Sequence, residues 1–238
     1  MKMKASVSAI NLLDNNRLAD DIFHELKSII SSILSSVELI ALYDGKSVPG
    51  KITRQTEAIK SQVIELDFQI QNIRIIQMML GKSFTVKRKM TNVHLFLNQL
   101  IREEPYTKLL SPAVEVQTGK GIHDAYIDEF VIRQLILNLF FWMNRHSSTY
   151  QLPKLVFSFE EGYFEIKGHF FANYIFSSPF KNSAHEHRVT DSELLNQPIC
   201  YLMSHLAALH DGDFEITAAP EKNVVVLVRI PYKPVGVR

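Results

Sequence analysis

One histidine near the beginning of a long amphipathic segment is well placed for covalent chemistry. His24 is followed directly by an acid, Glu25, and a neutral imidazole can act as a nucleophile. Apolar residues around it recur at alternating three- and four-residue steps, the pattern of a buried helical stripe: Ile22, Leu26, Ile29, Ile33, Val37 and Ile40. At about 100° per residue, His24 lies about 200° from Ile22 and should point outward. The same face carries small side chains that would let a partner approach closely: Ser28, Ser31 and Ser35. An ordinary exposed histidine fits this spacing equally well.

The elements that would position His24 are two long helices. The first is predicted from about residue 16 to residue 43, and Gly and Pro residues between Asp44 and Gly50 predict a turn. A second periodic apolar segment follows, from about Ile59 to Ile73. Such a hairpin leaves apolar surface uncovered on its inner side, and pairing with a second copy into a four-helix bundle would cover it. We therefore expect a homodimer.

The remainder of the chain alternates between strand and helix patterns and predicts a mixed sheet with helices on one face, an α+β arrangement. We expect domains 1–81 and 82–238. Strands are predicted at residues 84–88, 114–118, 155–159, 163–167, 214–217 and 223–230, and helices at residues 93–101, 127–144 and 194–210.

Composition excludes several classes of protein. A net charge of +1 over 238 residues gives no global field for nucleic acid or a membrane surface. A single cysteine, Cys200, excludes an internal disulfide and is expected in the core. No uninterrupted apolar run of about 18 residues occurs, so we expect a cytoplasmic protein without a membrane segment. His185-Glu186-His187 has no third ligand at zinc spacing, so no metal site is expected.

The order of predicted elements resembles the core of bacterial sensor histidine kinases over almost the whole chain. The phospho-acceptor motif of that family reads H-E-[LI]-[RK]-[TN]-P-L, and residues 24–30 match it except that Ile29 replaces the proline. The match implies that His24 is the phospho-acceptor, that Glu25 orients or deprotonates it, and that Ser28 helps to place water for dephosphorylation. Without the proline, the usual helix kink beside the histidine is lost.

The second half resembles the ATP-binding domain of the same kinases through residues 132–139, but the nucleotide-binding residues differ. Trp142 stands where the family has its magnesium-coordinating asparagine, and Phe141 precedes it. The segment 168–174 replaces the family's D-x-G-x-G, and residues 194–197 replace its phosphate-binding G-L-G-L. Magnesium, a hard cation, needs oxygen ligands, and neither Trp142 nor Phe141 provides one. Binding of ATP is therefore not expected, and the second domain should be a degenerate ATPase-like α/β sandwich.

A phospho-acceptor histidine without an ATP site resembles the dimeric histidine phosphotransferases of bacterial phosphorelays. The resemblance implies that His24 passes a phosphoryl group between aspartates of response-regulator receiver domains. Magnesium would be held by the receiver, so this chain needs no cofactor. The expected partners are receiver domains, a hybrid histidine kinase and a second copy of the chain. Candidate docking residues are Phe23, Lys27, Ser28, Ser31 and Ser35, with Gln69 and Asn72 on the second helix.

Two other functions compete with phosphotransfer. A non-catalytic pseudokinase could bind and regulate a kinase or response regulator, with His24 incidental. An autophosphorylating kinase with an unusual nucleotide pocket is disfavoured by Trp142 and by the missing glycines.

Overall fold

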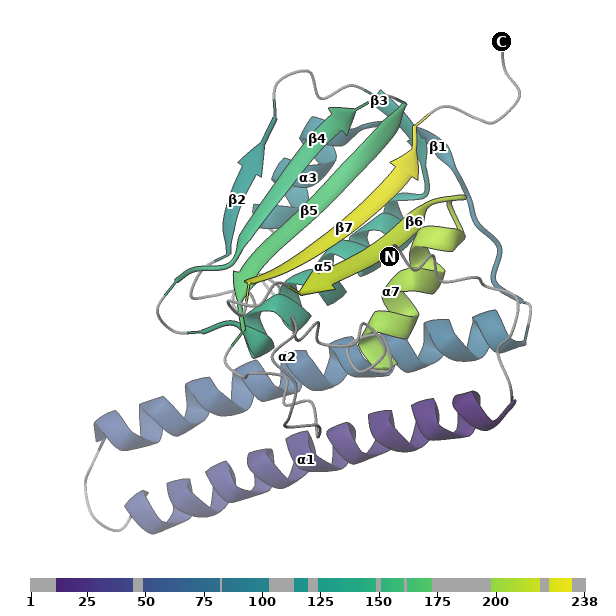
Figure 1. Cartoon of the computed structure of the whole chain (residues 1–238). Helices are drawn as coiled ribbons and strands as arrows, with labels where there is room; N and C mark the ends of the chain where they lie inside the picture. The colour runs from purple at the N-terminus through teal and green to yellow at the C-terminus, as the bar shows by residue number, and fades with distance from the viewer. Residues whose placement is uncertain are drawn as a thin grey trace, which may run out of the picture. The chain divides into compact units, whose positions relative to one another are not determined.

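The computed structural model describes residues 12–44, 49–81, 83–102, 114–119, 124–148, 151–160, 162–172, 198–218 and 223–232. They form two compact units, a helical hairpin and a sheet covered by helices (Figure 1). The chain passes from one unit to the other between Phe84 and Thr85. The boundary predicted from sequence, between residues 81 and 82, lies three residues earlier.

The hairpin consists of α1 (Leu12–Asp44) and α2 (Pro49–Leu80). Pro49 is the first residue of α2, where the missing amide hydrogen removes no helical bond. The predicted turn at 44–50 is therefore too long, since α2 has begun by Pro49, and residues 45–48 lie outside the described part. At its other end α2 is closed by the amides of Gly81 and Ser83, which donate to carbonyls of the last turn.

The face of α1 that is covered within the chain follows three- and four-residue steps through Leu26, Ile29, Ile33, Ser36 and Ile40. Ile29 and Ser36 are each 7% exposed, whereas Val37 is 48% exposed. The prediction that Val37 belongs to the buried stripe was wrong. After Ile33 the buried stripe continues with a three-residue step to Ser36. A four-residue step leads to Val37, whose side chain points about 100° away from that of Ser36.

The second unit contains one large and one small sheet. Its elements in chain order are β1 (Lys89–Asn92), α3 (Val93–Arg102), β2 (Glu115–Thr118), β3 (Asp124–Ile127), α5 (Glu129–His146), β4 (Lys154–Glu160), β5 (Tyr163–Phe171), α7 (Pro198–Ala208), β6 (Asp213–Ala218) and β7 (Asn223–Pro231). The large sheet has the order β2-β4-β5-β7-β6, with β2 parallel to β4 and the other pairs antiparallel. β1 and β3 form the small antiparallel sheet. The mixed α and β composition predicted from sequence is confirmed.

Helices lie on one face of the large sheet (Figure 1), and the strand sequences alternate accordingly. Every second residue of β5 and β7 is buried, among them Phe164, Ile166, Val226 and Val228. The helix α5 contributes an almost continuous run of buried residues to the same core.

Two predicted elements differ from the structure. The strand predicted at 84–88 is absent from the described residues 83–88, and β1 lies just after them, at Lys89–Asn92. β3 was missed because no element was predicted at residues 124–126, and Ile127 was taken for the first residue of a helix. That helix begins only at Glu129, because the Asp128 carboxylate accepts hydrogen bonds from Phe130 N and Val131 N and so caps it. The helix predicted at 194–210 is shorter, since α7 begins at Pro198, and residues 194–197 lie outside the described part.

Candidate functional site

His24 is exposed on α1, as predicted from its angle to the buried stripe. Phe23 beside it is 61% exposed, and Lys27 and Ser28 on the following turn are exposed as well. The side chain of Glu25 lies outside the described part of the chain. The imidazole is therefore open to an approaching protein, with a cation about one turn away.

The three serines predicted to share the face of His24 also lie on the surface. Ser31 and Ser35 are exposed, and Ser31 Oγ donates to the Lys27 carbonyl at 2.9 Å. A hydroxyl that bonds back to the preceding turn stays close to the helix. This face of α1 consequently has low relief beside His24.

One hydrogen bond defines the register of the two helices near His24. Gln62 Nε2 of α2 donates to Ser32 Oγ of α1 at 2.5 Å. His24 lies eight residues before Ser32, so the antiparallel partner at its level lies eight residues after Gln62, at Ile70. Ile70 is 51% exposed. Ile70 is therefore an exposed α2 side chain at the level of His24 along the hairpin.

The two α2 residues predicted to help in docking are not at the surface. Gln69 and Asn72 are 3% and 2% exposed, and Asn72 Nδ2 lies 3.4 Å from Gln69 Oε1. Sequence alone could not place them because the hairpin register was unknown. Nearby, burial raises the pKa of Glu65, which the same register places level with Ile29.

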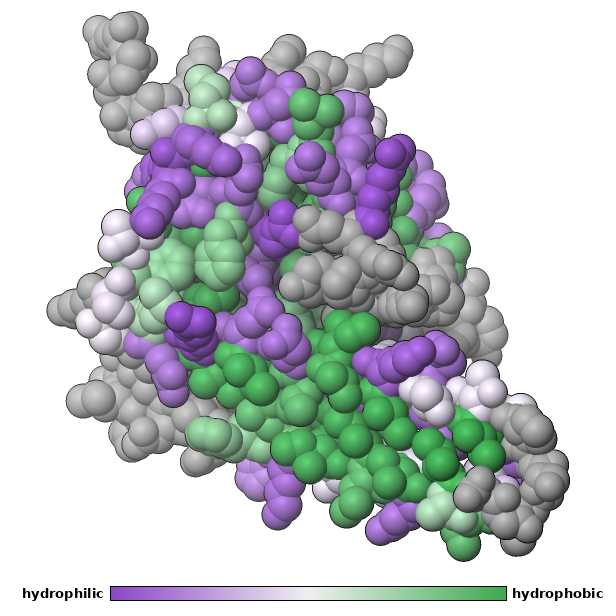
Figure 2. Space-filling view, turned by 180° about the vertical axis from the view of Figure 1, so that it is seen from behind, coloured by the Kyte–Doolittle hydropathy of each residue, from purple (hydrophilic) through white to green (hydrophobic). Residues whose placement is uncertain are grey.

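A second apolar stripe on α1 is uncovered, and it lies beside the buried one. We call it the outer seam, and it consists of Phe23, Ile30, Leu34 and Val37, which are 48–61% exposed. The outer seam follows seven-residue steps from Phe23 to Ile30 to Val37, the repeat of a helix that packs against another helix. Figure 2 shows a broad hydrophobic surface along the hairpin. The window Leu26–Tyr43 is long and apolar enough to cross a membrane, by length and composition alone.

Trp142, which the sequence resemblance would place at the magnesium-binding asparagine of histidine kinases, is part of the core of the second unit. It is 1% exposed and packs edge-on against Phe170, with ring centroids 5.2 Å apart, while His146 lies 5.5 Å away. Burial, and then the charge of Arg145, lower the pKa of His146. Aromatic side chains thus fill the space between α5 and β5.

Of the other segments that differ from the nucleotide-binding motifs of histidine kinases, the structure describes only residues 168–172. At Gly168 a Cβ would lie 2.8 Å from Met143 Sδ, so a side chain there would require Met143 to shift. Residues 173–174 and 194–197 lie outside the described part, as do His185-Glu186-His187. Among the described residues no group of three His, Cys, Asp or Glu side chains could hold a metal ion.

Comparison with solved structures identifies the fold. A structure of the histidine kinase AdeS from Acinetobacter baumannii matches 89% of this chain and 98% of its own, with 13% identity and a TM-score of 0.59. The chain has a histidine-kinase-like core. A bacterial phosphotransferase (15% identity, 92% of this chain and 98% of its own, TM-score 0.49) and the cytoplasmic segment of the histidine kinase QseC (10% identity, 70% and 95%, TM-score 0.48) are weaker matches. No protein-family model and no curated protein sequence matches the chain.

Sequence reasoning missed a polar cluster within the second unit, where the residues just before β1 contact the start of α5 and the residues that follow α7. Lys87 N donates to Asp128 Oδ2 at 2.6 Å, and Arg88 Nη2 donates to the Leu209 carbonyl at 2.7 Å and to Asp211 Oδ2 at 2.9 Å. Asp128 N donates in turn to His210 Nε2. Only the helix-capping signal of Asp128 was visible in the sequence.

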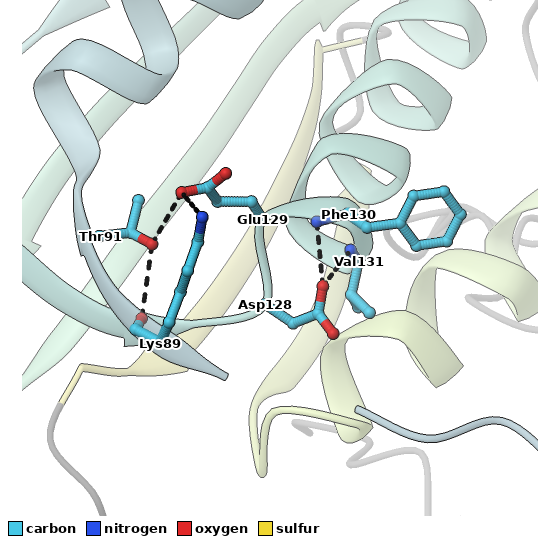
Figure 3. Close-up of polar contacts among 6 residues, drawn as sticks. All are labelled: Lys89, Thr91, Asp128, Glu129, Phe130 and Val131. Atoms are coloured by element: carbon cyan, nitrogen blue, oxygen red, sulfur yellow. Dashed lines mark hydrogen bonds and ion pairs between the residues drawn. The ribbon is translucent and has the colours of Figure 1, made fainter. Parts of the chain in front are cut away.

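Lys89, the first residue of β1, also contacts the start of α5. Lys89 Nζ and Thr91 Oγ1 both lie 3.0 Å from Glu129 Oε1, while Asp128 caps α5 alongside (Figure 3). Lys87, Arg88 and Lys89 thus attach the chain at the start of β1 to the beginning of α5 and to the residues that follow α7. This fixes where the chain enters the second unit.

Proposed function

We propose that this chain is a histidine phosphotransferase of two-component signalling that carries a phosphoryl group on His24 and does not bind ATP. The observation that carries the proposal is an exposed histidine on the first helix of a hairpin within a histidine-kinase-like fold. Trp142, packed against Phe170 at the position of the family's metal-binding asparagine, supports the loss of nucleotide binding.

The chemistry asks little of the protein beyond positioning. A ring nitrogen of His24 attacks the phosphorus of an aspartyl phosphate on a receiver domain. The bond between phosphorus and the aspartate oxygen breaks, the aspartate leaves as a carboxylate, and phosphohistidine forms. The reverse reaction with a second receiver returns the phosphoryl group to an aspartate. Magnesium bound by the receiver would neutralise the phosphoryl oxygens during both steps.

The neighbours of His24 have defined roles in this proposal. Glu25 accepts a hydrogen bond from the other ring nitrogen and so fixes the tautomer, and Ser28 lies one turn away, where it can position water. Lys27 contributes positive charge near the phosphoryl group. Ser31 and Ser35 provide the low surface on which the receiver packs, together with Ile70 of α2.

The proposal includes a homodimer in which the outer seam packs against a second hairpin. Support comes from the seven-residue spacing of Phe23, Ile30 and Val37 and from their exposure. Phe23, which the sequence suggested as a receiver contact, lies in the outer seam and so would contact the second copy instead.

The proposal is tested by following label from phosphorylated receiver domains in the presence of magnesium. Wild type should acquire acid-labile label, His24→Ala should acquire none, and Glu25→Gln should acquire it more slowly. His94→Ala, which removes an exposed histidine from α3, is the matched control and should behave as wild type. Label that survives in His24→Ala would refute the assignment. Label from ATP alone would identify a kinase, and receiver binding without label would identify a non-catalytic regulator.

A further inference from the structure

The contact that defines the register of the hairpin has a counterpart one heptad along both helices, beside His24. Gln62 Nε2 of α2 donates to Ser32 Oγ of α1. Glu25 lies seven residues before Ser32 on α1, and Gln69 lies seven residues after Gln62 on α2. Seven residues complete almost two helical turns, and the two helices run in opposite directions. The positions of Glu25 and Gln69 are therefore opposed as those of Ser32 and Gln62 are.

Gln69 is buried with an unused hydrogen-bond donor. The residue is 3% exposed, and its Oε1 accepts a hydrogen bond from Asn72 Nδ2 at 3.4 Å. Gln69 Nε2 is buried as well, and it has no hydrogen-bond partner among the residues that the structure describes. A buried donor without an acceptor is destabilising. The amide nitrogen of Gln69 therefore calls for an acceptor at its own level of the hairpin.

Glu25 is the acceptor that the register brings to this level. At about 100° per residue, its position on α1 is about 40° from that of Ile29 in the buried stripe and about 100° from that of His24. It stands between the covered face of α1 and the arc that carries the histidine. The pairing follows from this placement, since the Glu25 side chain lies outside the described part of the chain.

Glu65 is the other carboxyl group near Gln69, one turn earlier on α2. Both side chains are described, and Gln69 Nε2 makes no hydrogen bond to Glu65. Burial raises the pKa of Glu65 and so favours its neutral form, which is a weaker acceptor than a carboxylate. Glu25 is accordingly the better partner for Gln69.

We infer that Gln69 is a positioning residue for phosphotransfer, whose Nε2 donates a hydrogen bond to the carboxylate of Glu25. The inference rests on the proposed function of His24 and adds a residue of α2 to it. A carboxylate has two oxygens, so Glu25 can accept from Gln69 with one and from the ring of His24 with the other. A ligand to the histidine that is itself held in place fixes the tautomer more firmly than a free one. Gln69 does not touch the phosphoryl group and acts through Glu25.

The first test follows label from phosphorylated receiver domains onto the full chain. Gln69→Met keeps the length of the side chain and removes the donor, and it should slow labelling about tenfold at saturating receiver. The receiver concentration for half-maximal rate should not change, because Gln69 is buried away from the receiver. Adding Gln69→Met to Glu25→Ala should cause no further loss, since the two residues act as one unit.

Gln62→Met is the matched control. It removes the corresponding amide one heptad away, opposite Ser32, and should transfer as wild type does. Both single variants should lose similar amounts of stability in urea, so a purely structural effect would slow both alike. Gln69→Leu replaces Gln69→Met if that variant fails to fold.

The second test needs no receiver. Nitrogen NMR of labelled histidine in alkaline buffer, where imidazoles are neutral, gives the tautomer ratio of the His24 ring. Gln69→Met should shift this ratio in the same direction as Glu25→Ala, and Gln62→Met should leave it unchanged. This measurement decides the role of Gln69 even if wild type takes no label from receivers, so the two failures remain distinguishable.

Three results would overturn the inference. They are an unchanged tautomer ratio in Gln69→Met, equal slowing of transfer by Gln62→Met, and a full additional loss when Gln69→Met is combined with Glu25→Ala.

Discussion

Replacing Ile30 and Leu34 by serine removes the centre of the outer seam and should dissociate the proposed homodimer. The two side chains are 54% and 58% exposed in the single chain. Full burial of such a side chain is worth about 1.5–3 kcal/mol, so covering the exposed half contributes about 1 kcal/mol. Two side chains in each of two copies contribute about 4 kcal/mol. Since 1.4 kcal/mol corresponds to a factor of ten, the dimer dissociation constant should rise about a thousandfold.

The assay is sedimentation velocity over a wide range of protein concentration, with far-UV circular dichroism to verify the helices. Both residues are outside the buried stripe, so the double variant should keep its helical signal. Leu95→Ser is the matched control, because Leu95 is 61% exposed on α3 in the other unit. It should sediment as wild type does.

The reasoning fails if the double variant dimerises with wild-type affinity, or if Leu95→Ser dissociates the dimer equally well. A further arm uses lipid vesicles, because the window Leu26–Tyr43 also meets the length and composition of a membrane span. Wild-type protein that remains monomeric in solution and sediments with vesicles would show that the outer seam contacts lipid and not a second copy.

Three further predictions concern the kinase-like unit. Burial first, and then the charge of Arg88, lower the pKa of His210 from 6.5 to about 4, so the unfolded chain binds the proton more readily between these values. The free energy of unfolding should therefore fall by about 3 kcal/mol as the pH falls from about 6.5 to about 4. Urea titrations of His210→Gln at several pH values should show a weaker dependence of the unfolding free energy on pH. An unchanged pH dependence would contradict the assignment. Trp142→Asn should lower the free energy of unfolding by about 3–5 kcal/mol without creating affinity for a fluorescent ATP analogue, because the side chain is buried; wild-type stability or analogue binding would refute this. Cys200 is fully buried, which raises the pKa of its thiol, so a thiol reagent should label it only as urea unfolds the protein, and rapid labelling in native buffer would contradict its burial.

Periodicity in the sequence could predict which residues of a single helix point outward, because the angle between residues depends on that helix alone. The outward position of His24 followed from its angle to Ile22, because a helix rotates by a nearly constant amount per residue. Val37 was assigned to the wrong stripe because Ser36, a small polar residue, occupies the buried position that an apolar pattern was expected to fill. The strand β3 was missed because its four residues run directly into the cap of α5.

The features that could not be predicted join segments far apart in the chain. The burial of Gln69 depends on helix register, which the sequence does not determine and which contacts such as Gln62–Ser32 reveal. The cluster of Arg88, Asp128 and His210 draws on three segments separated by about forty to eighty residues, as the spacing of its hydrogen bonds shows. No local pattern marks such a cluster, since each member also fits an ordinary solvated role.

The two apolar stripes of α1 explain how His24 could remain accessible in the proposed dimer. At about 100° per residue, the buried stripe and the outer seam occupy adjacent arcs, and His24 lies about 100° beyond the centre of the outer seam. Ser28, Ser31 and Ser35 lie on this third arc with it. A helix in a four-helix bundle contacts two neighbours, so both stripes can be covered while the third arc stays open. If the proposed dimer forms, the high apolar content of α1 reflects two protein contacts, and the narrow polar arc that remains is the one that carries His24.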